Sequence, residues 1–289
     1  MMYGVSSMTD TLRRVAMRRP GGALLKADPA VWHYGPSFDP ERVDTEHSSF
    51  AELLQAKGVE IIWMNGDDHG IADAVFTYDA SLMTPEGAIL MSPGKPQRAG
   101  EQELHRSFYA SQDIAIVGEV VGEGRAEAGD TLWLDDNTLA VGRGFRTNKA
   151  GIEQLKALLK PINITVHEFD LPVYRGSAAC LHLMSLVSIV DSKTALISKL
   201  LFPAGLWELM HSLGFNLIEA PHAEFEESAT LSANVLAVSP GQCIMIDGFS
   251  STKHILEAAG IAVQVFSGDA LCIGCEGGPT CLTRPLLRR

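Results

Sequence analysis

A cysteine near the end of the chain has the sequence context of a nucleophile. Cys281 follows a Gly-Gly-Pro sequence at residues 277–279 and leads into an apolar closing stretch. Glycines before a reactive atom permit unusual backbone dihedrals and let a substrate come close. A thiolate on such a turn could attack an electrophilic carbon. The alternative is a small buried hydrophobe in a last strand, and the local sequence fits both interpretations.

Acidic residues and one histidine stand out in three other segments. Asp73 and Asp79 lie six residues apart on a strand-like run, where the two-residue period would place both on one face. Glu127 and Asp130 precede a predicted strand, and His182 interrupts an apolar run. Acidic residues before strands are often turn formers, and a lone histidine in an apolar segment is usually a hydrogen-bonded core residue. Each of these residues alone is therefore ambiguous.

The elements that would position these residues repeat along the chain. Hydrophobic patterning predicts strands at 131–134 and 138–142, a helix with Ile152, Leu155, Leu158 and Leu159 on one face, and a strand at 162–166. The same order of strand, turn, strand, helix and strand is predicted three more times. In each of these units the first, second and fourth ranges are strands and the third is the helix. The units are 186–190, 195–198, 206–213 and 215–218; 235–238, 243–246, 252–259 and 261–266; and 75–82, 88–91, 101–109 and 114–117. The first segment has a strand at 12–17, a helix at 46–57 and a strand at 59–63. It lacks one strand, which residues 282–287 could supply.

Five such units predict an α/β propeller of ββαβ units with five-fold pseudo-symmetry, in which the C-terminal strand closes the ring. A doubly wound parallel sheet ranks second, because the paired strands have the pattern of hairpins and no Gly-rich phosphate loop follows the first strand. The turn-rich stretches at 66–70 and 93–96 are interpreted as loops between units. Residues 1–289 are therefore predicted to form a single domain.

Composition narrows the choice of partners and compartment. The chain has 289 residues, of which 46% are hydrophobic and 20% charged, as is typical of soluble globular proteins. Its net charge is −12 and it has no Lys/Arg run, so neither nucleic acid nor a membrane is expected as a partner. Five cysteines without a disulfide pattern, and an N-terminus without a signal peptide, favour a cytoplasmic location.

Six short motifs occur in order along nearly the whole chain: Asp73-Ala74-Val75-Phe76-Thr77-Tyr78-Asp79, Arg98-Ala99-Gly100-Glu101, Glu127-Ala128-Gly129-Asp130, Arg146-Thr147-Asn148-Lys149-Ala150-Gly151, Leu181-His182-Leu183 and Gly277-Gly278-Pro279-Thr280-Cys281. Each alone is unspecific. Their order and spacing resemble the pentein, or guanidine-modifying, superfamily, and within it the dimethylarginine dimethylaminohydrolase and amidinotransferase families. The family fold is the five-unit α/β propeller that the repeats predict.

The resemblance implies a hydrolase for the guanidino group of arginine or an N-substituted arginine, with citrulline and an amine or ammonia as products. Cys281 would attack the guanidinium carbon to give a covalent amidino-thioether, since a thiol is intrinsically nucleophilic and keeps useful thiolate near neutral pH. His182 would protonate the departing amine and then deprotonate the attacking water. Asp79 and Glu127 would hold the guanidinium by charge-assisted hydrogen bonds, with Glu127 counted among the catalytic residues.

The resemblance also implies further contacts with the substrate. Arg98 and Arg146 match a pair that grips the α-carboxylate, for which a planar guanidinium is better suited than an ammonium. Asp73 would orient the substrate or its neighbours, and Asp130 and Tyr78 are additional candidates. Tyr78 departs from the pattern, because dimethylarginine hydrolases typically have an acid there. One carboxylate on the substrate side is therefore missing.

Other activities use the same residues. An amidinotransferase would pass the amidino group from Cys281 to an amine instead of water, and an arginine deiminase-type activity also fits. A non-catalytic propeller binding protein should lack the Cys, His and carboxylate set, which this chain has. The expected partner is a small guanidino compound, and a homodimer is left open.

No cofactor and no metal are expected. Cys272 and Cys275 form a Cys-x-x-Cys sequence, but a structural zinc site needs four ligands and no second pair follows. A redox link between Cys275 and Cys281 is an open hypothesis, because low-pKa thiols with near neighbours oxidise selectively. The default for Cys272 and Cys275 is a buried apolar role.

Overall fold

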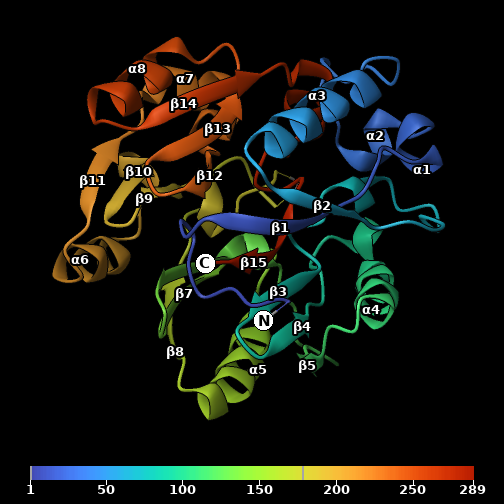
Figure 1. Ribbon diagram of the computed structural model, residues 1–289, viewed down its shortest axis with the longest axis horizontal. Coiled ribbons are helices and arrows are strands. Elements are labelled where there is room, and N and C mark those ends of the chain that lie inside the picture. Colours follow the sequence, from blue (N-terminus) through green and yellow to red (C-terminus); the bar gives the residue numbers. More distant parts are fainter. Residues whose placement is uncertain (1, 178) are drawn as a thin grey trace.

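The computed structural model describes residues 2–177 and 179–289. In this part of the chain the strands form five three-stranded sheets, which Figure 1 shows around a common centre. In each sheet the middle strand pairs antiparallel with one neighbour and parallel with the other. An antiparallel pair needs only a tight turn, whereas a parallel pair needs a crossover, usually a helix. This is the ββαβ order that the repeats predict, and the predicted α/β propeller is confirmed.

The sheets follow the order of the chain except for the first. That sheet combines β15 (Arg284–Arg288), β1 (Leu12–Met17) and β2 (Glu60–Trp63). The others contain β3 (Ser81–Thr84), β4 (Gly87–Leu90) and β5 (Ile116–Glu119); β6 (Thr131–Asp135), β7 (Thr138–Arg143) and β8 (Thr165–Asp170); β9 (Val187–Asp191), β10 (Thr194–Ile197) and β11 (Asn216–Glu219); β12 (Leu236–Ser239), β13 (Gln242–Ile246) and β14 (Ala262–Phe266).

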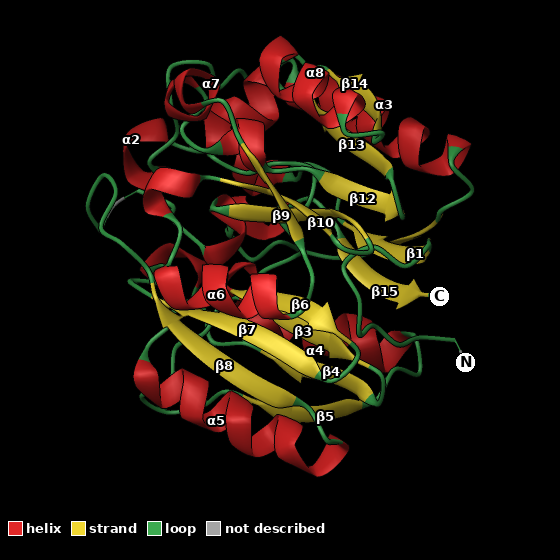
Figure 2. Ribbon diagram, turned by 90° about the vertical axis from the view of Figure 1, so that its left-hand side faces the viewer, coloured by secondary structure: helices red, strands yellow, loops and turns green. Residues whose placement is uncertain are grey.

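The crossover helices lie toward the outside of the molecule (Figures 1 and 2). They are α3 (Val43–Ala56), α4 (Glu101–Ser111), α5 (Lys149–Leu159), α6 (Ala204–Ser212) and α8 (Ser250–Ala258). Three further helices lie outside the repeat: α1 (Gly22–Leu25), α2 (Pro29–Trp32) and α7 (His222–Glu227).

Helix α5 shows why these segments fold as helices. The side chain of Asn148 caps its first turn by accepting a hydrogen bond from the Gly151 amide at 2.8 Å. Ile152, Leu155 and Leu159 recur at helical spacing and are fully buried. The sequence-predicted apolar face is therefore the face that packs on the sheet.

The two ends of the chain meet in the first sheet. Strand β15 pairs antiparallel with β1, and the Gly4 amide adds a hydrogen bond to the Leu286 carbonyl at 2.8 Å. The last strand therefore completes the first unit, as the sequence predicts. Because β15 is held in the centre of the molecule, the turn just before it, which carries Cys281, is held there too (Figure 1).

Two predicted strands are wrong. Residues 72–79 do not themselves form a strand. Ala72–Val75 forms a 3-10 turn, and β3 begins only at Ser81. The amides of Phe76 and Thr77 bond to carbonyls two or three residues back, so no neighbouring strand pairs with this apolar run. The two-residue period therefore does not relate Asp73 to Asp79.

The strand predicted at 162–166 begins at Thr165 instead. Lys160–Ile162 forms a 3-10 turn with Pro161 in its first turn, and Asn163 has a left-handed backbone with φ of 60°. Proline lacks an amide proton and restricts the backbone, so it ends the preceding helix rather than entering a ladder. The strand therefore starts after the turn has been completed.

Candidate active site

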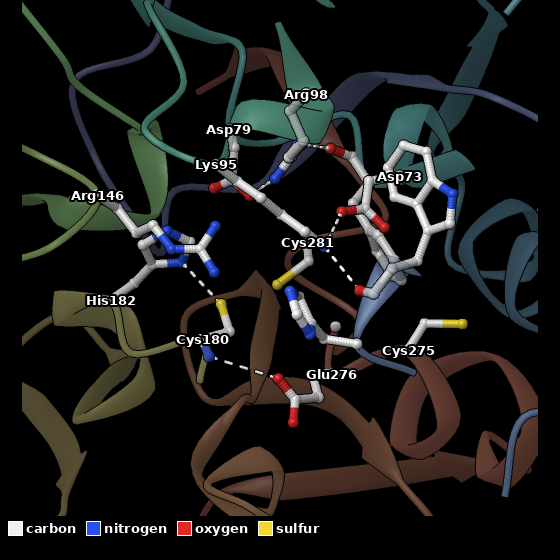
Figure 3. A pocket seen from close by; sticks show the side chains of 14 residues that line it. Asp73, Asp79, Lys95, Arg98, Arg146, Cys180, His182, Cys275, Glu276 and Cys281 are labelled. Atoms are coloured by element: carbon white, nitrogen blue, oxygen red, sulfur yellow. Dashed lines mark hydrogen bonds and ion pairs between the residues drawn. The ribbon is translucent and has the colours of Figure 1, made fainter. Parts of the chain in front are cut away.

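One pocket collects most of the residues singled out in the sequence. Figure 3 shows their side chains pointing into a common space. The lining residues are Trp32, His33, Asp73, Phe76, Asp79, Lys95, Arg98, Arg146, Cys180, His182, Cys275, Glu276, Gly277 and Cys281. Six of them are predicted site residues: Cys281, His182, Asp79, Asp73, Arg98 and Arg146. They come from four of the five units. Asp73 and Asp79, His182 and Cys281 precede β3, β9 and β15, whereas Arg98 and Arg146 follow β4 and β7.

Hydrogen bonds fix the turn that carries Cys281. Asn234 accepts from the Thr280 amide at 3.1 Å, and its Nδ2 lies 3.5 Å from the Cys281 Sγ. A side chain on Gly277 would collide with the ring of Phe76, and one on Gly278 would collide with Asn234. The two glycines are thus required by the close approach of neighbouring side chains. The thiol is partly exposed to the pocket.

His182 forms a buried ion pair with Glu127. The His182 Nε2 lies 2.6 Å from Glu127 Oε2, and both side chains are almost completely shielded from solvent. Glu127 Oε1 accepts from the amides of Gly94 and Lys95 at 2.8 and 3.1 Å. With Nε2 bound to Glu127, Nδ1 is the nitrogen left for proton transfer, and Cys180 Sγ lies 3.7 Å from it.

This pair is charged in the resting protein. Burial opposes ionisation of Glu127, but hydrogen bonding and charge from His182, with Arg146 adding to the effect, lower its pKa below its ordinary value. Burial also opposes the charged form of His182. The negative charge that Cys180 and Asp79 can carry outweighs that effect and raises its pKa well above 6.5. Imidazolium and carboxylate therefore face each other at neutral pH.

Burial has the largest effect on the pKa of the Cys281 thiol. It raises the pKa to about 12, and the Asp79 carboxylate and the Cys180 sulfur add to the shift, while His182 and the Gly278 backbone act in the opposite direction. The resting group is therefore a thiol and not a thiolate. A positive charge that arrives with a ligand would lower this pKa.

Asp79 and Asp130 have different positions. Asp79 lines the pocket, and its Oδ1 accepts from the Gly129 amide at 3.0 Å. Asp130 lies behind the pocket wall, fully buried, and accepts from the Thr147 hydroxyl at 2.6 Å and the Leu183 amide at 2.9 Å. Burial raises the pKa of Asp130 to about 6. Asp130 thus positions the backbone next to Arg146 and His182 without facing the pocket.

The two predicted carboxylate-binding arginines differ in what they already bind. Arg98 donates twice to Glu101 at 2.6 and 2.8 Å, once to Asp79 at 2.5 Å and once to the Phe76 carbonyl at 3.0 Å. Within residues 2–177 and 179–289, Arg146 donates to no hydrogen-bond acceptor, and its ion pair with Glu127 spans 3.7 Å. Arg146 is therefore the arginine that is available to a ligand.

Besides Asp130, two predicted residues do not face the pocket. Tyr78 lines a different cavity, and its ring lies 4.0 Å from the Arg284 guanidinium carbon. Glu127 lies directly behind His182 and is not among the lining residues.

Sequence reasoning missed several lining residues. Lys95 lies in the Pro-Gly-Lys-Pro stretch that is interpreted only as a loop, and Trp32 and His33 lie at the end of α2. Cys180 precedes His182 by two residues, and this spacing is the sequence signal that could have identified it as a pocket residue. Glu276 has a left-handed backbone with φ of 57°, which sequence alone does not show.

The atoms of Asp79, Glu127 and His182 lie within 4.8 Å of one another, close enough to share a cation. However, Asp79 already accepts from Arg98, and Glu127 and His182 bind each other. The oxygen and nitrogen atoms that could bind a metal ion thus already have partners within the protein. Cys275 also lines the pocket as a thiol, and burial raises its pKa above the ordinary value.

None of the helices in the described part of the chain combines the length and apolar character that crossing a bilayer requires.

Comparison with known proteins identifies the class. The family model described as arginine deiminase matches residues 69–212 and 199–288. The chain belongs to the arginine deiminase family, and the resemblance to the guanidine-modifying superfamily is confirmed. The N(G),N(G)-dimethylarginine dimethylaminohydrolase of Pseudomonas aeruginosa is 26% identical over 239 residues, which cover 82% of this chain and 86% of that protein.

Two solved structures show the same fold. Dimethylarginine dimethylaminohydrolase from Pseudomonas aeruginosa, in a complex with citrulline, has a TM-score of 0.79 and 22% identity, and the match covers 96% of this chain and 100% of that one. SxtG, an amidinotransferase from Microseira wollei, has a TM-score of 0.81 and 16% identity, with 100% and 98% covered. At these identities the similarity concerns the fold alone.

The charge state of His182 is testable by nitrogen NMR across about pH 5 to 9. Because its pKa is raised, we expect the His182 imidazole to keep both protons at pH 7 and to lose one only as pH rises through the higher value, where the stabilising ion pair is also lost. Glu127→Gln should lower that pKa, since the carboxylate that pairs with the imidazolium is removed. His105, whose pKa burial lowers to about 3, is a neutral reference in the same spectrum. Identical titration of His182 in both proteins would contradict the ion pair.

Proposed function

We propose that this protein is a hydrolase that acts on the guanidino group of arginine or of an N-substituted arginine and yields citrulline with ammonia or an alkylamine. One observation carries the proposal: a thiol, a protonated imidazole and a carboxylate line one pocket, from Cys281, His182 and Asp79. A guanidinium carbon is planar, cationic and deactivated by resonance. It therefore needs a strong nucleophile, a proton donor for the leaving nitrogen and an anion to hold it.

The first step is recognition of the cation. Asp79 is buried and lines the pocket. Its Oδ2 accepts from Arg98 and its Oδ1 from the Gly129 amide, and the second lone pair of each oxygen can accept from a guanidinium. Arg98 donates to Asp79 and to Glu101, and so holds the Asp79 carboxylate in place. Arg98 is thereby assigned a positioning role, and Arg146 is assigned the binding of a substrate carboxylate.

The bound cation then activates the nucleophile. Its positive charge beside Cys281 lowers the thiol pKa that burial raises, and the thiol releases its proton to solvent to form a thiolate. The thiolate sulfur bonds to the guanidinium carbon and gives a tetrahedral adduct. The bond from this carbon to the leaving nitrogen breaks as His182 Nδ1 donates its proton to that nitrogen. The product of this half-reaction is the amidino-thioether on Cys281 plus ammonia or an amine.

Water completes the reaction. Neutral His182 accepts a proton from the water as its oxygen bonds to the amidino carbon. The carbon–sulfur bond then breaks, which gives the ureido product and returns the thiolate. Glu127 holds the imidazole by its Nε2, so that Nδ1 keeps one orientation in both half-reactions. Asp130 supports the same orientation through the Leu183 amide.

Turnover of a substrate panel tests the proposal. Arginine, monomethylarginine, dimethylarginine and agmatine are incubated with the protein, and ureido products, ammonia and alkylamines are measured. Cys281→Ser should lower kcat by at least about a thousandfold, because the nucleophile is lost. Cys275 is the matched comparison, because it also lines the pocket as a free thiol, and Cys275→Ser should stay within about tenfold of the natural protein. Absence of turnover for every guanidine in the panel would overturn the proposal.

The same assay distinguishes hydrolysis from amidino transfer. Each substrate is measured with and without an amine acceptor such as glycine or ornithine. Hydrolysis gives a ureido product in both cases. Turnover only with an acceptor, with a new guanidino product, would replace the hydrolase with an amidinotransferase.

Substrate-assisted activation predicts a preference for cationic electrophiles. Chloroacetamidine and chloroacetamide differ mainly in charge, so the cation should alkylate Cys281 faster by at least about tenfold, after correction for their rates with a free thiol, because one pKa unit changes the thiolate fraction tenfold. Asp79→Asn should reduce this preference. Equal corrected rates for the two reagents at pH 7, measured by mass spectrometry, would contradict activation by a bound cation.

A further inference from the structure

Lys95 places a further cation on the wall of the pocket. Its Nζ lies 2.6 Å from Asp73 Oδ2 and 3.0 Å from the Trp32 carbonyl oxygen, and only 12% of the side chain is exposed (Figure 3). The indole ring of Trp32 lies 5.4 Å from the same nitrogen. These contacts hold the ammonium in one place, at the side of the pocket that the end of α2 covers.

The available hydrogen-bond donors single out Lys95 and Arg146. An arginine has five N–H donors, and Arg98 uses four of them on Glu101, Asp79 and a backbone carbonyl. A lysine has three, and Lys95 uses two, on Asp73 and on the Trp32 carbonyl. One N–H donor of Lys95 therefore remains for a ligand. The donors of Arg146 also remain, because Arg146 donates to no acceptor within the described residues.

The Lys95 side chain also has a suitable length and direction. Its backbone amide donates to Glu127, whose side chain holds His182 at the reacting end of the pocket. From there its flexible four-carbon stem runs to Asp73 and Trp32. An arginine substrate has three methylene groups between its guanidinium and its α-carbon. A substrate that lies along Lys95 would therefore bring its carboxylate near the Lys95 ammonium.

We propose that Lys95 is a specificity-determining residue, which with Arg146 binds the carboxylate of an amino-acid guanidine and so selects against guanidines without one. The inference rests on the proposed function, since it concerns the same pocket. Asp73 acts on Lys95 by holding its ammonium, and its Oδ1 is in turn bound by the Tyr34 hydroxyl at 2.8 Å. Asp73 and the Trp32 carbonyl leave one N–H donor of Lys95 unused, which an incoming carboxylate can accept.

Binding to catalytically silent protein tests this inference. In a Cys281→Ser background, dissociation constants of L-arginine and agmatine are measured by calorimetry, because agmatine lacks only the carboxylate. Lys95→Met should lower the preference for arginine over agmatine by about 10- to 100-fold, the effect of one hydrogen bond between charged groups. Lys95→Arg should restore most of it. Lys199→Met, at an exposed lysine that pairs with Glu219, is the control and should leave the preference unchanged.

The outcomes separate the inference from the proposed function. If Lys95→Met weakens both ligands equally, Lys95 only supports the pocket wall and the inference is overturned. Binding of neither ligand by the Cys281→Ser protein also overturns it. If the preference falls as expected but the natural protein turns over no guanidine, the Lys95 assignment stands and the hydrolase proposal fails. If the natural protein turns over a guanidine but Lys95→Met leaves the preference for arginine over agmatine unchanged, the hydrolase proposal stands and the Lys95 assignment fails.

Discussion

The buried ion pair between Glu127 and His182 is the interaction on which the pocket depends. It spans 2.6 Å and joins the segments that precede β6 and β9, two neighbouring units of the propeller. The amides of Gly94 and Lys95 bind the other carboxylate oxygen and bring in a third unit. Loss of one partner of a buried pair costs about 3–5 kcal/mol, so this contact fixes both the shape of the site and the charge on its imidazole.

The remaining buried charges follow the same requirement. A charge removed from water needs a partner, and the pocket supplies pairs of side chains for this purpose. The pairs are Lys95 with Asp73, Arg98 with Asp79 and Glu101, and His182 with Glu127. Among the residues that the structure describes, Arg146 has only the long contact with Glu127. The pocket therefore offers a carboxylate near the thiol and an incompletely paired cation elsewhere, which is the complement of a molecule with a cationic and an anionic end.

The sequence contains the repeat but not all of its local geometry. The five crossover helices and most strands lie within a few residues of their predicted positions, because amphipathic periodicity and turn residues act locally. The short helices α1, α2 and α7 were not predicted. The run at residues 72–79 was misassigned, since an apolar run in a central buried loop has the same composition as a buried strand. What decides between them is the presence of a pairing partner, which is a tertiary property.

The site shows the same limit. Cys281, His182 and Asp79 were found from motif order and do line one pocket. The ion pair between Arg98 and Glu101 could be suspected from their spacing of three residues. The buried ion pair between Arg98 and Asp79 could not be predicted from the sequence. Lys95 lies in a Pro-Gly-Lys-Pro loop whose composition indicates only an exposed turn. Its role appears only once Asp73 and α2 are brought beside it.

The mechanism requires a covalent bond between Cys281 and the substrate carbon. Acid quenching during steady-state turnover of arginine, followed by peptide mass spectrometry, detects this bond. We expect a peptide with Cys281 that carries the substrate-derived amidino group. A Cys281 peptide that stays unmodified while citrulline is formed, with the same rate in Cys281→Ser, would rule out nucleophilic catalysis by Cys281.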